Sequence, residues 1–355
     1  MKRPAITPMQ RVMTAVTHAE PDRVPFFFLV TMHGAKELGL SIEEYFSKAE
    51  NVVEGQLRLR AKYGHDCLYN LFYAAIELEA WGGETFFRDD GPPNAGAPII
   101  CKPEDIKSLK PPKVKETRCL AKVLKATELL KSRVGDDVPI IGVVMSPFSV
   151  PVMQMGFDKY IELMYEQPEL FDHLMKVNEA FCVDWANAQL EAGATAICYF
   201  DPVSSTTVTS RAMYLKAGFK VAKRTISKIK GPIATHMASG RCKPIVADLA
   251  ETGTAMVGVS ALEDLAEVKA AFKGKVSILG NLNAIEMRRW TPAQAETVVK
   301  EAIAKAGVGG GFILSDNHGE IPWQVSEDVL LAVAEAVRKW GRYPLNWAKE
   351  YGRQT

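Results

Sequence analysis

Short apolar segments recur along the chain and alternate with longer stretches of helical spacing. Each segment is about as long as a buried parallel strand. Most are apolar at consecutive positions, as expected for strands that are covered on both faces. The predicted strands are Val24–Val30, Asp66–Leu71, Pro139–Met145, Ala194–Phe200, Pro232–His236, Ala255–Val259, Val276–Gly280 and Gly311–Ser315.

Helical periodicity fills the intervals between these strands. The clearest helix is predicted over Pro168–Ala192, because proline stands in its first turn and Leu174 and Phe181 share an apolar face. Further helices are predicted over Pro244–Glu251, Leu262–Phe272, Pro292–Ala306 and Ser326–Trp340. Thr291 and Ser326 have the side chains and positions typical of helix N-caps.

Eight strands that alternate with helices predict an α/β fold, a single (β/α)8 TIM barrel that forms one domain over residues 1–355. An open, doubly wound sheet is the alternative that strand counting leaves open. A helical extension precedes the first strand. The segment Tyr73–Ala97 breaks the alternation and is predicted to be an insertion after strand two, on the face where barrel enzymes bind substrate. It could act as a lid.

Composition narrows the range of functions. Apolar residues make up 47% of the chain and charged residues 24%, and the formal net charge is +1. This balance gives no reason to expect binding to nucleic acid or to an anionic membrane. No apolar run approaches the roughly 18 residues that span a bilayer, and Met1–Pro4 is not followed by a signal-peptide core. The six cysteines are scattered, which favours reduced thiols and a cytoplasmic location.

Polar and aromatic side chains gather where the predicted strands end. Catalytic groups of TIM barrels project from the C-terminal ends of the strands, so these positions are candidates for the site. The residues predicted to bind substrate are His33, Tyr73, Met145, Tyr199, Asn281 and Trp323. The catalytic candidates are Asp201, His236, His318 and Glu320.

A cluster of metal-ligand types follows the last strand. Asp316, His318 and Glu320 lie within five positions, and His236 would join them from across the barrel. Imidazole and carboxylate ligands suit zinc with an open coordination position. Two readings stay open here, since Asp201 and Asp316 are also placed to cap helix N-termini. If no metal binds, acid catalysis by His236, His318 and Asp201 takes its place.

Several segments resemble the uroporphyrinogen decarboxylase superfamily over nearly the whole chain. The opening, from Met9-Gln10-Arg11-Val12 to Pro21-Asp22-Arg23-Val24-Pro25, is similar to the start of that family. The likeness continues in the following segments: Gly142–Pro147, Glu191–Ala194 with Asp201-Pro202, His236, Leu279–Asn281 and Gly310–Pro322.

The resemblance points to one of two branches. Porphyrin decarboxylases of the family carry an arginine-rich element after the first strand, whereas this chain has Thr31–Lys36 there, without an arginine pair. The other branch contains methyltransferases that act on corrinoid proteins. Those that methylate thiols hold zinc with a His-x-Cys pair and a later Cys. Here His236 is kept, but Ala238 replaces the first Cys and the second region reads Asp316–Glu320.

This departure leads to a specific functional hypothesis. Ligands of nitrogen and oxygen would leave zinc a harder Lewis acid, suited to an oxygen leaving group. We therefore expect transfer of a methyl group from an O-methyl compound, in the first place a methoxylated aromatic, to cobalt(I) of a corrinoid (cobalamin) held by a partner protein. Two alternatives remain: methyl transfer from methylcobalamin to a thiol or folate, and a non-catalytic barrel that binds a corrinoid or pterin. Family analogy alone suggests a homodimer.

Overall fold

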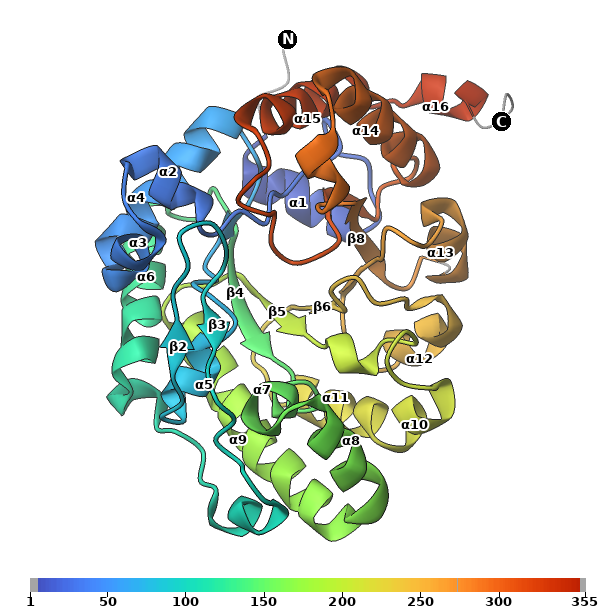
Figure 1. Cartoon of the computed structure of the whole chain (residues 1–355). Helices are drawn as coiled ribbons and strands as arrows, with labels where there is room; N and C mark the ends of the chain where they lie inside the picture. The colour runs from blue at the N-terminus through green and yellow to red at the C-terminus, as the bar shows by residue number, and fades with distance from the viewer. Residues whose placement is uncertain (1–5, 273, 352–355) are drawn as a thin grey trace.

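The computed structural model describes residues 6–272 and 274–351, and Met1–Pro4 lies outside these ranges. Seven parallel strands form one curved sheet in the order β1-β4-β5-β6-β7-β8-β9. Their bounds are β1 Leu68–Tyr69, β4 Ile140–Met145, β5 Ala196–Phe200, β6 Ile233–His236, β7 Met256–Gly258, β8 Ser277–Leu282 and β9 Phe312–Asp316. The sheet curls round a central axis, with the helices outside it (Figure 1).

The segment predicted as the first strand closes this sheet into a barrel. Phe26 makes a parallel bridge with Leu314 of β9, and the amide of Asp66, just before β1, donates to the carbonyl of Phe26. The chain is too irregular here to count as a strand, since Pro25 has no N–H and the Phe26 amide donates to the Asp66 side chain instead. The predicted (β/α)8 barrel is confirmed, with one strand reduced to a bridge.

Helices cover the outside of the barrel. The long ones are α4 Ala49–Tyr63, α6 Arg118–Val134, α9 Pro168–Glu191, α14 Pro292–Ala306 and α15 Glu327–Trp340. The shorter ones are α1 Pro8–Val16, α2 His33–Leu38, α3 Ile42–Ser47, α5 Ile76–Ala80, α7 Pro151–Met155, α8 Phe157–Glu166, α10 Arg211–Lys216, α11 Gly218–Ile226, α12 Val246–Ala250, α13 Leu265–Phe272 and α16 Asn346–Tyr351. In none of the described helices is an apolar stretch long enough to cross a bilayer.

The predicted caps and boundaries agree closely with the structure. Thr291 caps α14 through a capping box with Gln294, and Ser326 caps α15 by accepting from the Val329 amide. The predicted start of α13 is three residues early, because Asp264 accepts from the amides that follow it and fixes the helix start there.

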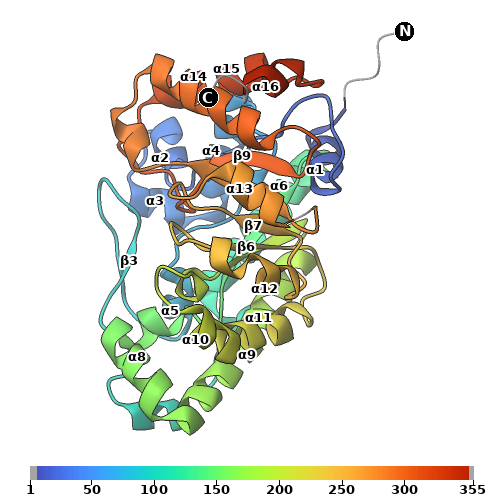
Figure 2. The same cartoon turned by 90° about the vertical axis from the view of Figure 1, so that its right-hand side faces the viewer.

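Two additions lie at opposite ends of the barrel (Figure 2). The N-terminal extension is α1, which lies against the N-terminal ends of the strands. The insertion after β1 forms α5 and a hairpin of β2 Thr85–Phe86 and β3 Asn94–Ala95 on the other side. The side chain of Gln324 donates to the carbonyl of Asp90 at 2.8 Å, so the hairpin touches the loop after β9.

The motif at the start of the chain is explained by a buried ion-pair network at the α1 end. Arg11 of α1 reaches both Asp22, at 2.6 Å, and Asp66, at 2.7 Å. Asp66 also pairs with Arg23 at 2.8 Å and is 1% exposed. The network ties the extension, the closing segment and β1 together. Its role is structural, far from the ends of the strands that carry His236 and Asp316.

Candidate active site

The ring of His236, at the end of β6, is held between two neighbours. It stacks on Phe200 of β5, with centroids 5.1 Å apart and planes 9° apart. On its other side a Cβ added to Gly258 of β7 would lie 2.6 Å from the ring's Cδ2 atom, so only glycine leaves room there. Burial among these groups, together with the nearby His318, lowers the pKa of His236 to about 4. His236 is therefore neutral near pH 7.

The hydrogen bond at Nδ1 fixes where the proton of His236 sits. Nδ1 accepts from the backbone amide of Ala238 at 3.0 Å, so in the neutral ring the proton is on Nε2. Nε2 is buried and has no partner in the described part of the chain. His236 thus offers an unused N–H donor at the C-terminal end of the barrel.

His318 is arranged in the same way. The amide nitrogen of Asn317, in the orientation that satisfies its neighbours, donates to Nδ1 of His318 at 2.6 Å. The amide of His318 in turn donates to Asp316 at 2.9 Å. Burial lowers the pKa of His318. The site therefore contains two neutral imidazoles, each with its proton on Nε2.

The pKa values of two carboxyl groups, at the end of β9 and in the loop after it, are raised above the usual range. Burial raises the pKa of Asp316 to about 7 and that of Glu320 to about 8, and the charge of Asp316 adds to the second shift. Asp316 accepts from the amides of His318 and Gly319 through one oxygen, while the other is buried without a partner. Glu320 is therefore largely protonated at pH 7 and can donate a proton.

These four residues do not fit a zinc site in this arrangement. Among the described residues no three His, Cys, Asp or Glu side chains stand together as metal ligands. The donor chemistry agrees, because the Nδ1 contact of His236 puts a proton on the nitrogen that would have to bind the metal.

Asp201 is brought to the same end of the barrel but faces inward to serines. It is 1% exposed and accepts from Ser146 at 2.5 Å and Ser149 at 2.7 Å, and its amide donates to the carbonyl of His236 at 2.7 Å. Burial raises its pKa. Asp201 holds the loop after β4 against β5 and β6. The alternative given above for Asp201 was a structural role as a helix N-cap. Asp201 does have a structural role, but it accepts from serine hydroxyls and not from the amides of a helix N-terminus.

His33 and Trp323 form a second group beside the loop after β9. Their rings lie 6.0 Å apart, and the ammonium of Lys36 sits 4.2 Å above the Trp323 ring. His33 is 3% exposed, and burial lowers its pKa to about 3. Both predicted residues thus lie at the C-terminal end, where they are close to each other.

Tyr73 and Met145 both form hydrogen bonds with glutamates of the insertion. The Tyr73 hydroxyl donates to Glu79 at 2.7 Å, and the Met145 amide donates to Glu77 at 2.8 Å. Glu77 itself is 3% exposed, and burial raises its pKa to about 8. The Met145 contact therefore holds the insertion on the barrel, whereas the Tyr73 contact lies within the insertion.

Tyr199 and Asn281, which were predicted to bind substrate, are engaged in other contacts in this structure. Tyr199 is fully buried in the layer between sheet and helices, where it joins the core that contains Phe181 and Trp185. It alternates with Cys198 along β5, and only one of two successive side chains can face the lumen. The Asn281 amide donates to the carbonyls of Ser260 and Glu263 and so fixes the loop after β7.

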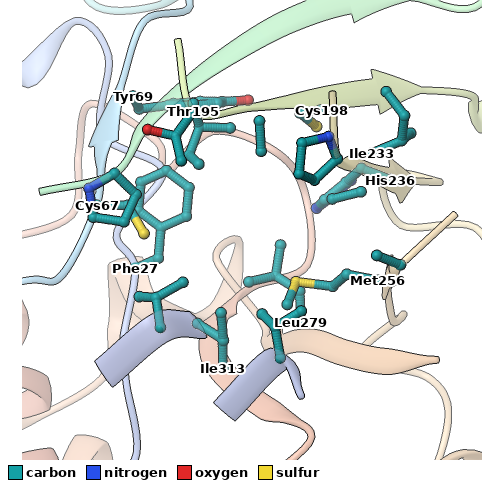
Figure 3. Close-up of a pocket in the computed structure, with 18 of the residues that line it drawn as sticks. Phe27, Cys67, Tyr69, Thr195, Cys198, Ile233, His236, Met256, Leu279 and Ile313 are labelled. Carbon is teal, nitrogen blue, oxygen red and sulfur yellow. The ribbon is translucent and has the colours of Figure 1, made fainter. Parts of the chain in front are cut away.

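A cavity of about 110 Å³ occupies the interior of the barrel beneath His236 (Figure 3). We call it the lumen cavity. Its lining runs from Met13 of α1 and Pro232, at the N-terminal ends of the strands, through Cys198 and Met256 to His236. TIM barrels normally fill this space with layers of side chains. The cavity thus connects the α1 end of the molecule with the candidate site.

Sequence reasoning missed Gly258, Glu77 and the lumen cavity. A signal existed for Glu77, which is a carboxylate between Ile76 and Leu78 in an otherwise apolar stretch. Gly258 appears in the sequence as a glycine inside a predicted strand. Such a glycine indicates that another group approaches the backbone closely, but it does not indicate which group. The cavity depends on how side chains from nine separate segments meet, which spacing along the chain does not express.

The fold and the site define a TIM-barrel protein whose titratable groups converge at the C-terminal end of the strands. A family model described as "Uroporphyrinogen decarboxylase (URO-D)" matches residues 7–340, and the chain belongs to this family. Its relatives include proteins named for two reactions. The chain is 25% identical over 251 residues to the uroporphyrinogen decarboxylase of Idiomarina loihiensis, covering 66% of the chain and 67% of that protein.

The second relative is the methylcobamide:CoM methyltransferase MtaA of Methanosarcina barkeri, 24% identical over 214 residues. That alignment covers 60% of the chain and 62% of the relative, so the chain matches less than two thirds of its length. Among solved structures, a methyltransferase from Methanosarcina mazei superposes with a TM-score of 0.85 at 19% identity, over 94% of this chain and 99% of that one. This likeness confirms the fold.

Proposed function

We propose that the protein is a corrinoid-dependent methyltransferase that takes a methyl group from an O-methyl compound. The observation that carries the proposal is the pair of neutral imidazoles, His236 and His318, with a protonated Glu320 in the same loop region. Two N–H donors and an acid are what a departing oxygen needs as its bond to carbon breaks. The methylcobamide:CoM methyltransferase relative supports the corrinoid assignment.

Each residue has a defined part in this chemistry. A cobalt(I) corrinoid, when bound, supplies the nucleophile and the electron pair for the new bond to the methyl carbon. The methyl–oxygen bond breaks and its electron pair stays on the oxygen. The Nε2–H groups of His236 and His318 donate hydrogen bonds to that oxygen, and Glu320 gives it a proton. The products are an alcohol or phenol and a methylated corrinoid.

Porphyrin decarboxylation, named in other relatives, fits the described site less well. Its substrate carries many carboxylates, which need cationic partners. The segment Thr31–Lys36 supplies one cation, Lys36, and its ammonium is already engaged with the ring and carbonyl of Trp323. The lining of the lumen cavity, in the part of the chain the structure describes, contains no Lys or Arg.

A partner that carries the corrinoid has an apolar surface to bind. Val208, Leu262 and Ile285 are 40%, 64% and 37% exposed, and they lie in the loops that follow β5, β7 and β8 at the C-terminal end of the barrel. Exposed apolar side chains grouped on one face mark interaction sites more often than isolated ones do. A protein docked there would present its cofactor to the site from the open end of the barrel.

The test uses the whole chain with cobalamin reduced to cobalt(I). Methoxylated aromatics, methanol and methylamines are added one at a time, and methylation of cobalt is followed by absorbance while the demethylated product is identified. Methylation from an aryl or alkyl ether supports the proposal. No methylation of cobalt with any ether, together with demethylation of methylcobalamin by a thiol or folate, would show that transfer runs in the opposite direction and would contradict the proposal.

A set of histidine variants separates catalysis from simple binding. His236→Gln and His318→Gln should each lower the rate of methyl transfer by roughly 10²–10³-fold, because each removes a donor to the leaving oxygen. His173→Gln, at an exposed histidine of α9, is the matched control and should retain full activity. Unchanged rates in both site variants would favour a non-catalytic binding barrel.

A further inference from the structure

The interior of the barrel is underfilled because several inward-facing side chains are small. Cys67, Ala196, Cys198 and Ala234 line the lumen cavity at positions where bulky branched residues normally fill a TIM barrel. Apolar cavities of roughly 150 Å³ in other proteins stay dry and take up benzene. At about 110 Å³ the lumen cavity is smaller than these, so the part of a ligand inside it is no larger than a single six-membered ring or a short alkyl chain.

The chemistry of the lining restricts what can bind. Of the lining residues that the structure describes, none carries a formal charge near pH 7. The hydroxyl of Tyr69 donates to the Gly319 carbonyl at 3.3 Å, and that of Thr195 accepts from the Ile140 amide at 3.1 Å. The residue His236 is 1% exposed, and its Nε2 is a buried nitrogen that has no hydrogen-bond partner in the described part of the chain.

The lining of the cavity includes exposed residues at the N-terminal end of the barrel. Met13 of α1 is 44% exposed and Pro232 is exposed, and both line the cavity at the N-terminal end of the strands. Figure 2 shows α1 on the side of the barrel opposite the β2–β3 hairpin. The lining of the lumen cavity therefore extends to the surface at the end of the barrel away from the loops where a partner protein would dock.

We propose that the lumen cavity binds the apolar part of the substrate, an uncharged single ring or short alkyl chain, with an ether oxygen held by Nε2–H of His236. This inference rests on the proposed function and narrows its substrate class to small uncharged ethers such as anisole. The ring lies inside the barrel, the oxygen is at His236, and the methyl group points toward the open C-terminal end.

Binding can be tested without any turnover. Fluorobenzene is titrated into the protein and followed by fluorine NMR, and xenon is introduced into crystals to locate the site. We expect saturable binding and xenon density among Cys198, Ala234 and Met256. Absence of both would overturn the proposal.

Cavity variants tie that binding to the lumen. Ala234→Leu fills the space and should weaken fluorobenzene binding at least tenfold, while Ala293→Leu, the same change at an exposed position of α14, should leave it unchanged. Leu279→Ala enlarges the cavity and should improve binding of a larger ring such as naphthalene. Thermal unfolding of each variant shows that it is folded. Equal binding by the wild type and Ala234→Leu would place the ligand elsewhere and refute the proposal.

The hydrogen bond between the ether oxygen and His236 can be tested by comparing the affinities of two ligands. Anisole should bind roughly 3- to 10-fold more tightly than ethylbenzene, its isostere without an acceptor, and this preference should vanish in His236→Phe. The two proposals fail separately. Binding of anisole in the lumen without methyl transfer would sink the proposed function alone, whereas methyl transfer that is unaffected by Ala234→Leu would sink the lumen proposal alone.

Discussion

The ring of His236 lies against that of Phe200, 5.1 Å away and nearly parallel, while the backbone of Gly258 closes the other face. The imidazole is thus positioned by three adjacent strands, β5, β6 and β7. Its Nδ1 contact with Ala238 settles the remaining rotation and the tautomer. A catalytic donor fixed on the strands of a barrel is held more tightly than one carried by a loop.

The first prediction concerns the space beside this ring. Gly258→Ala should force His236 out of its position, because the new methyl group would lie 2.6 Å from Cδ2. We expect methyl transfer to fall by ~10- to 100-fold, since small misplacements of a catalytic group cost about that much. The measurement is the rate with reduced cobalamin. Gly91→Ala, whose added methyl meets no atom within 4 Å, is the control and should behave as wild type.

The second prediction is a pH profile set by Glu320. Its pKa of about 8 keeps the acid form below that pH, so the rate should be level from pH 6 to 7.5 and fall about tenfold per unit above pH 8. In Glu320→Gln the falling limb should disappear and the rate should be lower by ~10²-fold. A variant that keeps the limb would assign it to another group.

The third prediction concerns stability and the buried Glu77. Its folded-state pKa is raised from 4.5 to about 8, so the folded protein keeps a proton that the unfolded chain releases. The free energy of unfolding should therefore fall as the pH rises from about 5 to 8, at about 1.4 kcal/mol per pKa unit involved. Urea unfolding at several pH values measures this. Glu77→Gln should make the dependence less steep, and Asp316 and Glu320, whose pKa values are also raised, account for the slope that remains. Glu104→Gln, at an exposed glutamate, should leave the slope as it is in the wild type.

The fourth prediction concerns Asp66. Asp66→Asn leaves the guanidinium groups of Arg11 and Arg23 without their buried partner, which typically costs about 3–5 kcal/mol. Glu54→Gln breaks an exposed pair with Arg58 at the same 2.8 Å separation as Arg23 and Asp66 and should cost no more than ~0.5 kcal/mol. Equal losses in chemical denaturation would show that the buried network adds nothing special.

The fifth prediction separates the partner from the chemistry. Leu262→Asp should weaken turnover with a corrinoid-carrying protein by raising its KM about tenfold or more, because a charge replaces an exposed apolar contact. Turnover with free cobalamin should stay the same. Tyr165→Asp, on α8 and 64% exposed like Leu262, is the control and should affect neither assay.

The sequence was informative in several places where local chemistry decides the structure, although the Asp264 contacts that start α13 were missed. Strand order, the bounds of α14 and the caps Thr291 and Ser326 follow from periodicity and capping, which operate within a few residues. The first strand was less predictable, because a side chain 40 residues away, Asp66, takes the Phe26 amide that a regular ladder would use. That competition depends on the folded arrangement.

The candidate site could be predicted only in part, because the orientation of its side chains also depends on the folded arrangement. Position along a strand placed His236 and His318 at the C-terminal end, but it could not show which way a side chain faces. Tyr199 and Cys198 are neighbours on β5, and only the second lines the lumen. Whether His236 carries its proton on Nε2 depends on one contact with Ala238, which is a matter of ring orientation. The single domain and the homodimer remain predictions.

The bridge between Phe26 and Leu314 joins the two extremes of the chain, and α1 is held by the same late segment through the amide of Gly311 and the carbonyl of Ala15. During synthesis, the barrel therefore cannot close until β9, near the end of the chain, has left the ribosome. Until then the segment of Phe26 and β8 have open edges that invite mispairing with other nascent chains. Slow synthesis, or a shortened C-terminal end, should burden this protein with a dependence on chaperones that its buried core alone would not suggest.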